Sequence, residues 1–313
     1  MTHSSSPAPP ARGQGTDSNS GLLFGVAAYL CWGFFPLYWP LLAPAGALEV
    51  LAHRVVWSLV FCIGLLTFTR TWGAFGRIAR NSRLMLALAA ASVVIAINWG
   101  AFIWGVTNGH VIETSLGYFI NPLVTVLLAV FVLGETLRQW QWAAVALGSI
   151  AVVVLTIDYG RPPWVALTVA SSFAAYGFLK KRANLGTVES LSMETAILAP
   201  VALGFLVFLQ VTGSLTFGHE GAGNVALLLG TGLVTAIPLL LFGAAATRLS
   251  LATIGILQYL GPILQFLFGL FWFEEDMSPA RWAGFTLVWL ALVIFTVDGI
   301  RARRRVVAPL DAI

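Results

Sequence analysis

The chain has 313 residues, of which 58% are hydrophobic and only 10% are charged, and its mean hydropathy is +0.88. That many apolar residues cannot be buried in one soluble core, so the composition excludes a water-soluble globular protein and predicts one that uses lipid as its solvent. The formal net charge of +4 would suit a nucleic-acid-binding protein, but the basic residues lie in short clusters between apolar runs, which excludes a nucleic-acid-binding patch.

The apolar runs predict an all-α integral membrane protein. A hydrocarbon core of about 30 Å is crossed by about 20 helical residues. Residues 1–20, rich in Ser, Pro and Gly, are predicted to be a disordered tail without a signal peptide, and residues 301–313 a basic tail. The ten predicted transmembrane helices are 21–42, 47–69, 84–105, 112–133, 138–157, 163–179, 190–211, 224–246, 251–273 and 280–299.

The distribution of basic residues predicts which loops face the cytoplasm. If both termini are cytoplasmic, the inner segments contain fourteen of the 17 Lys and Arg residues, and alternate loops separate as the positive-inside rule requires. We therefore place the protein in the inner membrane with both termini in the cytoplasm. The fourteen are Arg12, Arg70, Arg77, Arg80, Arg83, Arg138, Lys180, Lys181, Arg182, Arg248, Arg301, Arg303, Arg304 and Arg305.

An offset of 140 residues superimposes one half of the chain on the other. It aligns residues 112–135 with residues 252–275. In the same register Pro122 falls on Pro262, Glu135 on Glu275 and Asp158 on Asp298. We divide the chain into a first repeat at 21–159 and a second at 160–300, of five helices each. Because five is odd, the repeats enter the membrane from opposite sides, and such inverted repeats predict alternating access to a site between them.

Several kinds of chemistry are excluded by what the sequence lacks. Cys31 and Cys62 lie inside the first two spans and indicate small core residues, not a disulfide or a metal pair. The four His residues have no metal-ligand spacing, and no GxxxxGK[ST] phosphate loop occurs. We therefore predict neither an enzyme nor a cofactor or metal, and any driving energy must come from an ion gradient or a partner.

The blocks AAYLCWGFFPLYWPLL, LEVLAHRVVWSL, INWGAFIWGVTNGHVIETSLGYFINPL, ESLSMETAILAPVAL and LQYLGPILQFLFG carry a family resemblance. The chain resembles the RarD-type permeases, a branch of the EamA group in the drug/metabolite transporter superfamily, from residue 21 to about residue 300. The resemblance implies a ten-helix inner-membrane permease with two EamA-type halves. Some members are labelled as chloramphenicol-sensitivity proteins, but the resemblance does not supply a natural substrate.

Charged residues inside the spans are the first candidates for a site. A charge at mid-bilayer costs about 2.5 to 3.5 kcal/mol. His53 could be a protonatable gate and Arg54 an anchor for an anionic group; alternatively, Arg54 snorkels to the interface or pairs with Glu49. The 140-residue offset places Glu194 opposite Arg54, as a coupling or cation-binding residue or, alternatively, as a structural carboxylate at a helix end.

Uncharged polar and aromatic residues form a second group of candidates. A buried amide must find a partner in hydrocarbon, so these side chains either line a cavity or join neighbouring helices. Taken together they favour a cavity lining. They are Asn98, Trp99, Tyr118, Asn121, Gln258 and Tyr259. Trp32 and Tyr176 each lie beside a glycine in the first span of a repeat and could stack on a flat solute, or simply pack between helices.

The small multidrug pumps of the same superfamily carry a carboxylate in their first helix that exchanges protons for drugs. Residues 21–42 and 163–179 contain no Asp or Glu. That mechanism therefore cannot be transferred to this chain, and proton coupling, if present, must use His53, Glu113 or Glu194.

We predict a permease that moves a small organic solute, a metabolite or a drug, outward by alternating access. The alternative is a passive pore or lipid scramblase with the same ten-helix architecture. The predicted partners are the solute and the lipid bilayer, with no nucleic acid. A homodimer is compatible with the sequence, which does not determine the oligomeric state.

Overall fold

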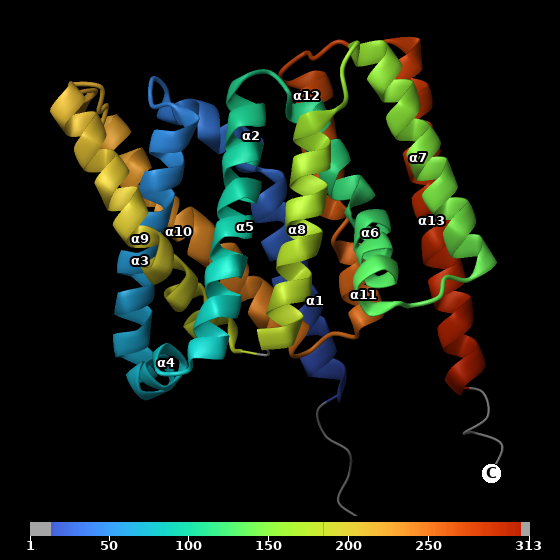
Figure 1. Ribbon diagram of the computed structural model, residues 1–313, viewed down its shortest axis with the longest axis horizontal. Helices are drawn as coiled ribbons and strands as arrows, with labels where there is room; N and C mark the ends of the chain where they lie inside the picture. Colours follow the sequence, from blue (N-terminus) through green and yellow to red (C-terminus); the bar gives the residue numbers. More distant parts are fainter. Residues whose placement is uncertain (1–13, 184, 308–313) are drawn as a thin grey trace, which may run out of the picture.

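The computed structural model describes residues 14–183 and 185–307, and all secondary structure in these ranges is helical (Figure 1). The helices are α1 (Gln14–Gly33), α2 (Phe35–Tyr38), the 3-10 helix η1 (Trp39–Leu42), α3 (Ala47–Thr69), α4 (Trp72–Ala79), α5 (Ser82–Thr107), α6 (Val111–Leu133), α7 (Gln139–Tyr159), α8 (Trp164–Ala183), α9 (Thr187–Thr212), α10 (Gly221–Ala246), α11 (Leu251–Leu257), α12 (Leu260–Phe271) and α13 (Pro279–Val307).

Helix ends reach into both predicted tails. Helix α1 begins at Gln14 and α13 continues to Val307, so each extends beyond the span predicted for it. The rest of the predicted tails, residues 1–13 and 308–313, lies outside the described residues.

Eight helical segments of the described chain are long and apolar enough to cross a membrane. The number is nine if the bent pair of segments Asn19–Gly33 (in α1) and Phe35–Leu42 (α2 with η1) is one span. These segments establish an integral membrane protein. Helix α8, predicted as a span at 163–179, is not among them. Its last turns carry Lys180 and Lys181, and it packs against both α5 and α6. Residues of α8 that face α5 and α6 need not be apolar, while Trp164 and Phe173 of the same helix are exposed.

The helices lie side by side, and their neighbours come from both halves of the chain (Figure 1). The α7 and α13 pair forms one edge of the bundle, and α3, α9 and α10 form the other. Between them, α8 packs against α5 and α6, and α1 packs against α10 and α12. The core therefore lies between the halves and not separately within each.

Two ion pairs join α7 to α13, one near each end of this antiparallel pair. Arg138 Nε donates to Asp298 Oδ2 at 2.7 Å, and Arg281 Nε donates to Asp158 Oδ2 at 2.7 Å. Asp158 and Asp298 are the residues that the 140-residue offset equates. The edge pair is thus held at both ends by the same kind of contact.

Two spans are interrupted. The chain bends by 42° between α1 and α2, after Gly33, where an added Cβ would lie 2.6 Å from Leu264 Cδ1. The ninth predicted span breaks at Gln258 and Tyr259, between α11 and α12. Helix α6, by contrast, is continuous through Pro122.

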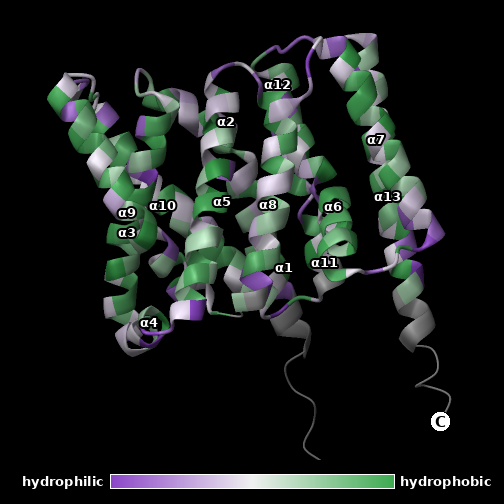
Figure 2. Ribbon diagram, viewed as in Figure 1, coloured by the Kyte–Doolittle hydropathy of each residue, from purple (hydrophilic) through white to green (hydrophobic). Residues whose placement is uncertain are grey.

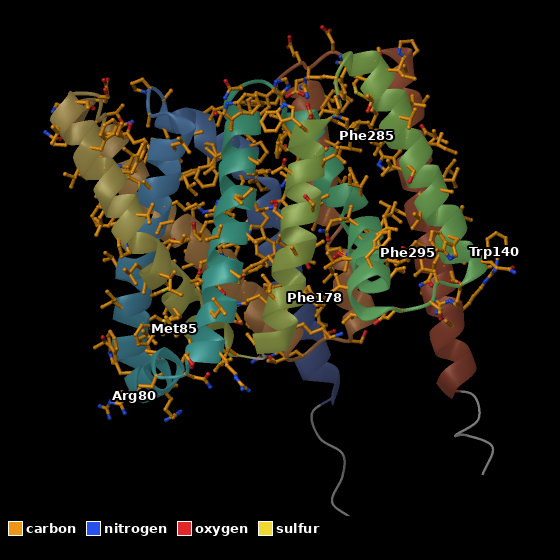
Figure 3. The ribbon with its side chains drawn as sticks, in the orientation of Figure 1. Arg80, Met85, Trp140, Phe178, Phe285 and Phe295 are labelled. Carbon is orange, nitrogen blue, oxygen red and sulfur yellow. The ribbon has the colours of Figure 1, made fainter. Side chains whose placement is uncertain are left out.

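Apolar residues cover the helices, and polar residues gather at the ends of the bundle (Figure 2). The short helix α4 lies at the lower end of the view, where the labelled Arg80 is exposed (Figure 3). Phe285 of α13 is fully buried and packs against Phe266 of α12, with 4.9 Å between the ring centroids. Aromatic packing of this kind closes the interior between α12 and α13.

Candidate functional site

Arg54 is the centre of a buried cluster built by helices of both halves. It is the eighth residue of α3, and only 4% of it is exposed. Its Nε donates to Thr235 Oγ1 of α10 at 2.8 Å, and its guanidinium carbon lies 4.0 Å from the centroid of the Trp99 ring of α5. The rings of Trp39 and Phe35 lie at 5.2 and 5.7 Å. The charge is therefore surrounded by aromatic faces.

No carboxylate of the described residues lies within ion-pair distance of Arg54. The predicted alternative pairing with Glu49 is absent, because the Glu49 carboxylate accepts from the backbone N–H groups of Thr216 and Phe217 and lies beside His53. Glu113 and Glu194, the other deeply buried acids, pair with Arg161 and Lys180. Arg54 is thus a buried charge whose counter-charge is not supplied by the described chain.

Asn98 and Tyr118 continue this cluster towards α8. The Tyr118 hydroxyl donates to Asn98 Oδ1 at 3.3 Å. Asn98, 1% exposed, donates from Nδ2 to the Val169 carbonyl at 2.9 Å and to Ser172 Oγ at 3.1 Å. These bonds connect α5, α6 and α8, and Trp99, the neighbour of Asn98 in α5, lies against Arg54 of α3.

The remaining uncharged candidates lie elsewhere. Asn121 donates to the Ala170 carbonyl at 3.0 Å and joins α6 to α8. The Trp32 ring packs against Tyr29 and Phe242. Tyr259 packs against the core between α6, α8 and α13, and Gln258 is the C-cap residue that follows α11. None of these side chains contacts Arg54 in the described structure. Their role as solute contacts therefore remains a prediction.

His53 points away from the Arg54 cluster, although the two residues are adjacent in sequence. Its Nδ1 accepts from Trp57 Nε1 at 3.2 Å, and its ring lies 4.8 Å from that of Phe217. Nε2 is 3.9 Å from Glu49 Oε1 and has no hydrogen-bond partner among the described residues. A buried imidazole beside a carboxylate is a suitable proton-binding group.

Glu194 belongs to a separate polar network at the equivalent depth of the second half. It is the eighth residue of α9, as Arg54 is of α3. Its carboxylate accepts from Lys180 Nζ at 2.9 Å, Ser190 Oγ at 2.8 Å and the Tyr176 hydroxyl at 2.9 Å. Glu194 and Tyr176 are therefore brought together, but both form their hydrogen bonds with residues of their own half.

Two glutamates bind neighbouring segments at the end of the bundle where the chain turns from α5 into α6. Glu113 accepts from Arg161 Nη2 at 2.8 Å and from the Val165 N–H at 3.0 Å, and this contact raises the pKa of the Arg161 guanidinium. Glu275 accepts from the backbone N–H groups of Val111 and Ile112 at the start of α6. Burial raises the pKa of Glu275, against the two N–H donors, which lower it.

Sequence reasoning missed Thr235 and Trp39, two partners of Arg54. Thr235 is an ordinary polar residue in an apolar span, and its offset-related residue in the first repeat is Ile95, so the repeat gives no signal. Within the described ranges, no group of three His, Cys, Asp or Glu side chains is placed to hold a metal ion.

Comparisons with known proteins agree with the family resemblance. The model of the EamA-like transporter family matches residues 19–157. Protein RarD of Streptomyces exfoliatus is 53% identical, over 95% of this chain and 94% of its own. An uncharacterized transporter, YojE of Bacillus subtilis, is 40% identical, over 93% and 98%. A crystal structure of a protein with 18% identity has a TM-score of 0.57 and is matched over 89% of this chain and 98% of that one, which shows a shared fold.

Proposed function

The chain belongs to the EamA-like transporter family as a RarD-type membrane permease, and on that premise we propose that it exports a small organic solute by alternating access. The observation that carries this proposal is the buried cluster of Arg54, Trp99, Asn98 and Tyr118, which lies where helices of both halves meet. A polar site enclosed by helices of both halves is what a carrier needs, because the halves can open it to either side in turn.

The helix contacts support ten spans in two inverted repeats. The 140-residue offset exchanges α1 with α8, α3 with α9, α5 with α10, α6 with α11–α12 and α7 with α13. The packed pair of α6 and α8 then becomes α12 and α1, and the pair of α5 and α8 becomes α10 and α1. Both products are also packed pairs, while α3 with α9 and α7 with α13 map onto themselves. We therefore count α8 as a tenth span.

The orientation that we propose puts both termini in the cytoplasm of an inner-membrane protein. The start of α1, the end of α13 and the arginine-bearing α4 all lie at the lower end of the bundle in Figure 1. Basic loops remain on the cytoplasmic side during insertion. The opposite, periplasmic end is then the one closed by Glu113 and Glu275.

The two ends differ in a way that suits one state of a carrier. Glu275 is half-buried on the first N–H groups of α6, whereas its repeat-related residue Glu135, at the cytoplasmic end, is exposed. We propose that the structure is closed to the periplasm, and that in the opposite state Glu135 contacts the start of α11 as Glu275 contacts the start of α6.

Reconstituted vesicles test the proposal. A thermal-shift screen of the purified protein against metabolites and antibiotics would identify solutes, and their flux would be measured in vesicles of both orientations under imposed pH gradients. We expect saturable flux that Trp99→Ala and Asn98→Ala abolish, while Trp72→Ala, at an exposed interfacial tryptophan, leaves it unchanged. Flux that does not saturate, or lipid transfer between leaflets, would favour the pore or scramblase and overturn the carrier.

A further inference from the structure

We propose that the solute carries a single negative charge, as a carboxylate or sulfonate, on an aromatic or otherwise apolar body, and that Arg54 binds that charge directly. This inference rests on the proposed permease function and specifies the chemical class of its solute. It is argued from the partners that Arg54 has and from those that it lacks.

The buried charge of Arg54 carries an energetic cost. A charged arginine in the interior of a membrane protein costs several kcal/mol unless an opposite charge or hydrogen-bond acceptors compensate for it. In the described structure one acceptor, Thr235 Oγ1, binds Nε, and no residue accepts from the two terminal nitrogens. Other buried charges of the described chain have such partners, as the pairs of Glu113 with Arg161 and Glu194 with Lys180 illustrate.

The shape of the Arg54 guanidinium determines which of its donors remain available. A guanidinium is planar, and its N–H donors point outward in that plane. Trp99, with its ring centroid 4.0 Å from the guanidinium carbon, lies over the group as a cation–π partner. Such a contact stabilises the charge without using the N–H donors. The donors of the terminal nitrogens are thus left for a planar acceptor, and a carboxylate accepts two of them in parallel.

The groups around Arg54 also bear on which solute it can bind. Trp39, whose ring lies 5.2 Å from the guanidinium, has an Nε1 donor that is buried and without a partner among the described residues. The neighbourhood is therefore rich in donors and poor in acceptors, which suits an anion. Phe35 and Trp99 add apolar surface for the rest of the molecule.

The charge of the group follows from counting cations. Lys180 of α8 and Arg161 in the turn before it are each paired with a buried glutamate, whereas Arg54 is a buried cation of the described chain without an ion pair. One free positive charge balances one negative charge. A phosphate monoester, with a charge near −2, would leave an uncompensated charge in a site of low polarity.

Matched probes test this inference. The purified full chain in detergent at neutral pH would be titrated with phenylacetate, its neutral isostere phenylacetamide and the cation phenethylammonium, and binding would be followed by thermal stabilisation and calorimetry. We expect phenylacetate to bind most tightly. Arg54→Gln should weaken it roughly ten- to hundredfold, the value of hydrogen bonds to a charged group, and should leave phenylacetamide unchanged.

Two further variants keep the result interpretable. Arg54→Lys retains the charge but not the planar fork, so it should prefer the anion with intermediate affinity even if Arg54→Gln fails to fold. Arg77→Gln removes an exposed arginine of α4 and should change nothing, which separates site binding from general attraction of anions.

The outcomes distinguish this inference from the proposed function. Equal binding of the three probes, no binding of phenylacetate, or unchanged anion binding in Arg54→Gln would each overturn the inference. If a neutral or cationic solute showed saturable, Trp99-dependent flux, the permease would stand and the anionic solute would not. If phenylacetate bound through Arg54 but every flux failed to saturate, the site would stand and the carrier would not.

Discussion

The close contact between α3 and α10 gives a sharp prediction, because it holds Thr235 against Arg54. At Gly232 of α10, an added Cβ would lie 2.4 Å from the carbonyl oxygen of Trp57 and 3.0 Å from the amide nitrogen of Ser58. Both are backbone atoms of α3, which cannot rotate aside. Since ordinary contact begins at 3.4 Å, Gly232→Ala must separate the two helices by about 1 Å.

The energy of this change can be bounded. Overpacking costs about 1 to 3 kcal/mol, and replacing glycine by alanine within a helix returns about 1 kcal/mol, so the net loss of stability is about 0 to 2 kcal/mol. The effect on the site is larger. Moving Thr235 by about 1 Å stretches its 2.8 Å bond to Arg54 beyond hydrogen-bond range. Transport should therefore fall about tenfold or more while the protein remains folded.

Gly204 provides the matched control, because it lies within α9 and an added Cβ there meets no atom within 4 Å. Apparent melting temperature and initial transport rate would be measured for Gly232→Ala, Gly204→Ala and the parent protein. We expect a lower melting temperature and a large loss of rate only for Gly232→Ala. If that variant keeps the parent rate, the α3–α10 contact does not position the site and the reasoning fails.

Three further predictions concern the ends of the bundle and its protonation. Because the Arg138 side chain is 48% exposed, a double-mutant cycle of Arg138→Gln with Asp298→Asn should give a coupling below about 1 kcal/mol, and a larger value would contradict solvent screening of this pair. Glu275→Ala should speed hydrogen exchange in the first turn of α6, since it removes the acceptor of two N–H groups; unchanged exchange would show that the contact does not hold that end. His53→Asn should remove the response of transport to an imposed pH gradient while preserving saturable flux, and an undiminished response would exclude His53 as the proton-binding group.

Span boundaries could be predicted from the sequence because lipid leaves little choice. The span predicted at 47–69 coincides with α3, Ala47–Thr69, since each residue in that run must be buried in protein or lipid and each N–H must bond within the helix. Helix α8 shows the limit of the same reasoning. Its packing against α5 and α6 is a tertiary property, so hydropathy alone cannot show whether its polar residues are tolerated.

Partners of the polar residues could not be predicted. The repeat offset set Arg54 opposite Glu194, which suggested complementary charges, but each has its own surroundings. Arg54 bonds to Thr235, 181 residues away, and Glu194 to Lys180, 14 residues away. The offset relates positions in the two halves but does not show which side chains meet, because those contacts depend on how the helices of the two halves pack.

If the permease alternates as proposed above, contacts present at both ends of the bundle and contacts present at one end predict which parts move. The ion pairs at the two ends of the α7 and α13 pair exist in the same structure, so alternation between states does not require either to break. The glutamate contact exists at one end, with Glu275 on α6, while the repeat-related Glu135 is exposed. In a two-fold arrangement, a contact that forms at one end only can be exchanged for the equivalent contact at the other end. On the proposed alternating access, α7 and α13 would form a static edge, and the starts of α6 and α11 would move relative to the other half.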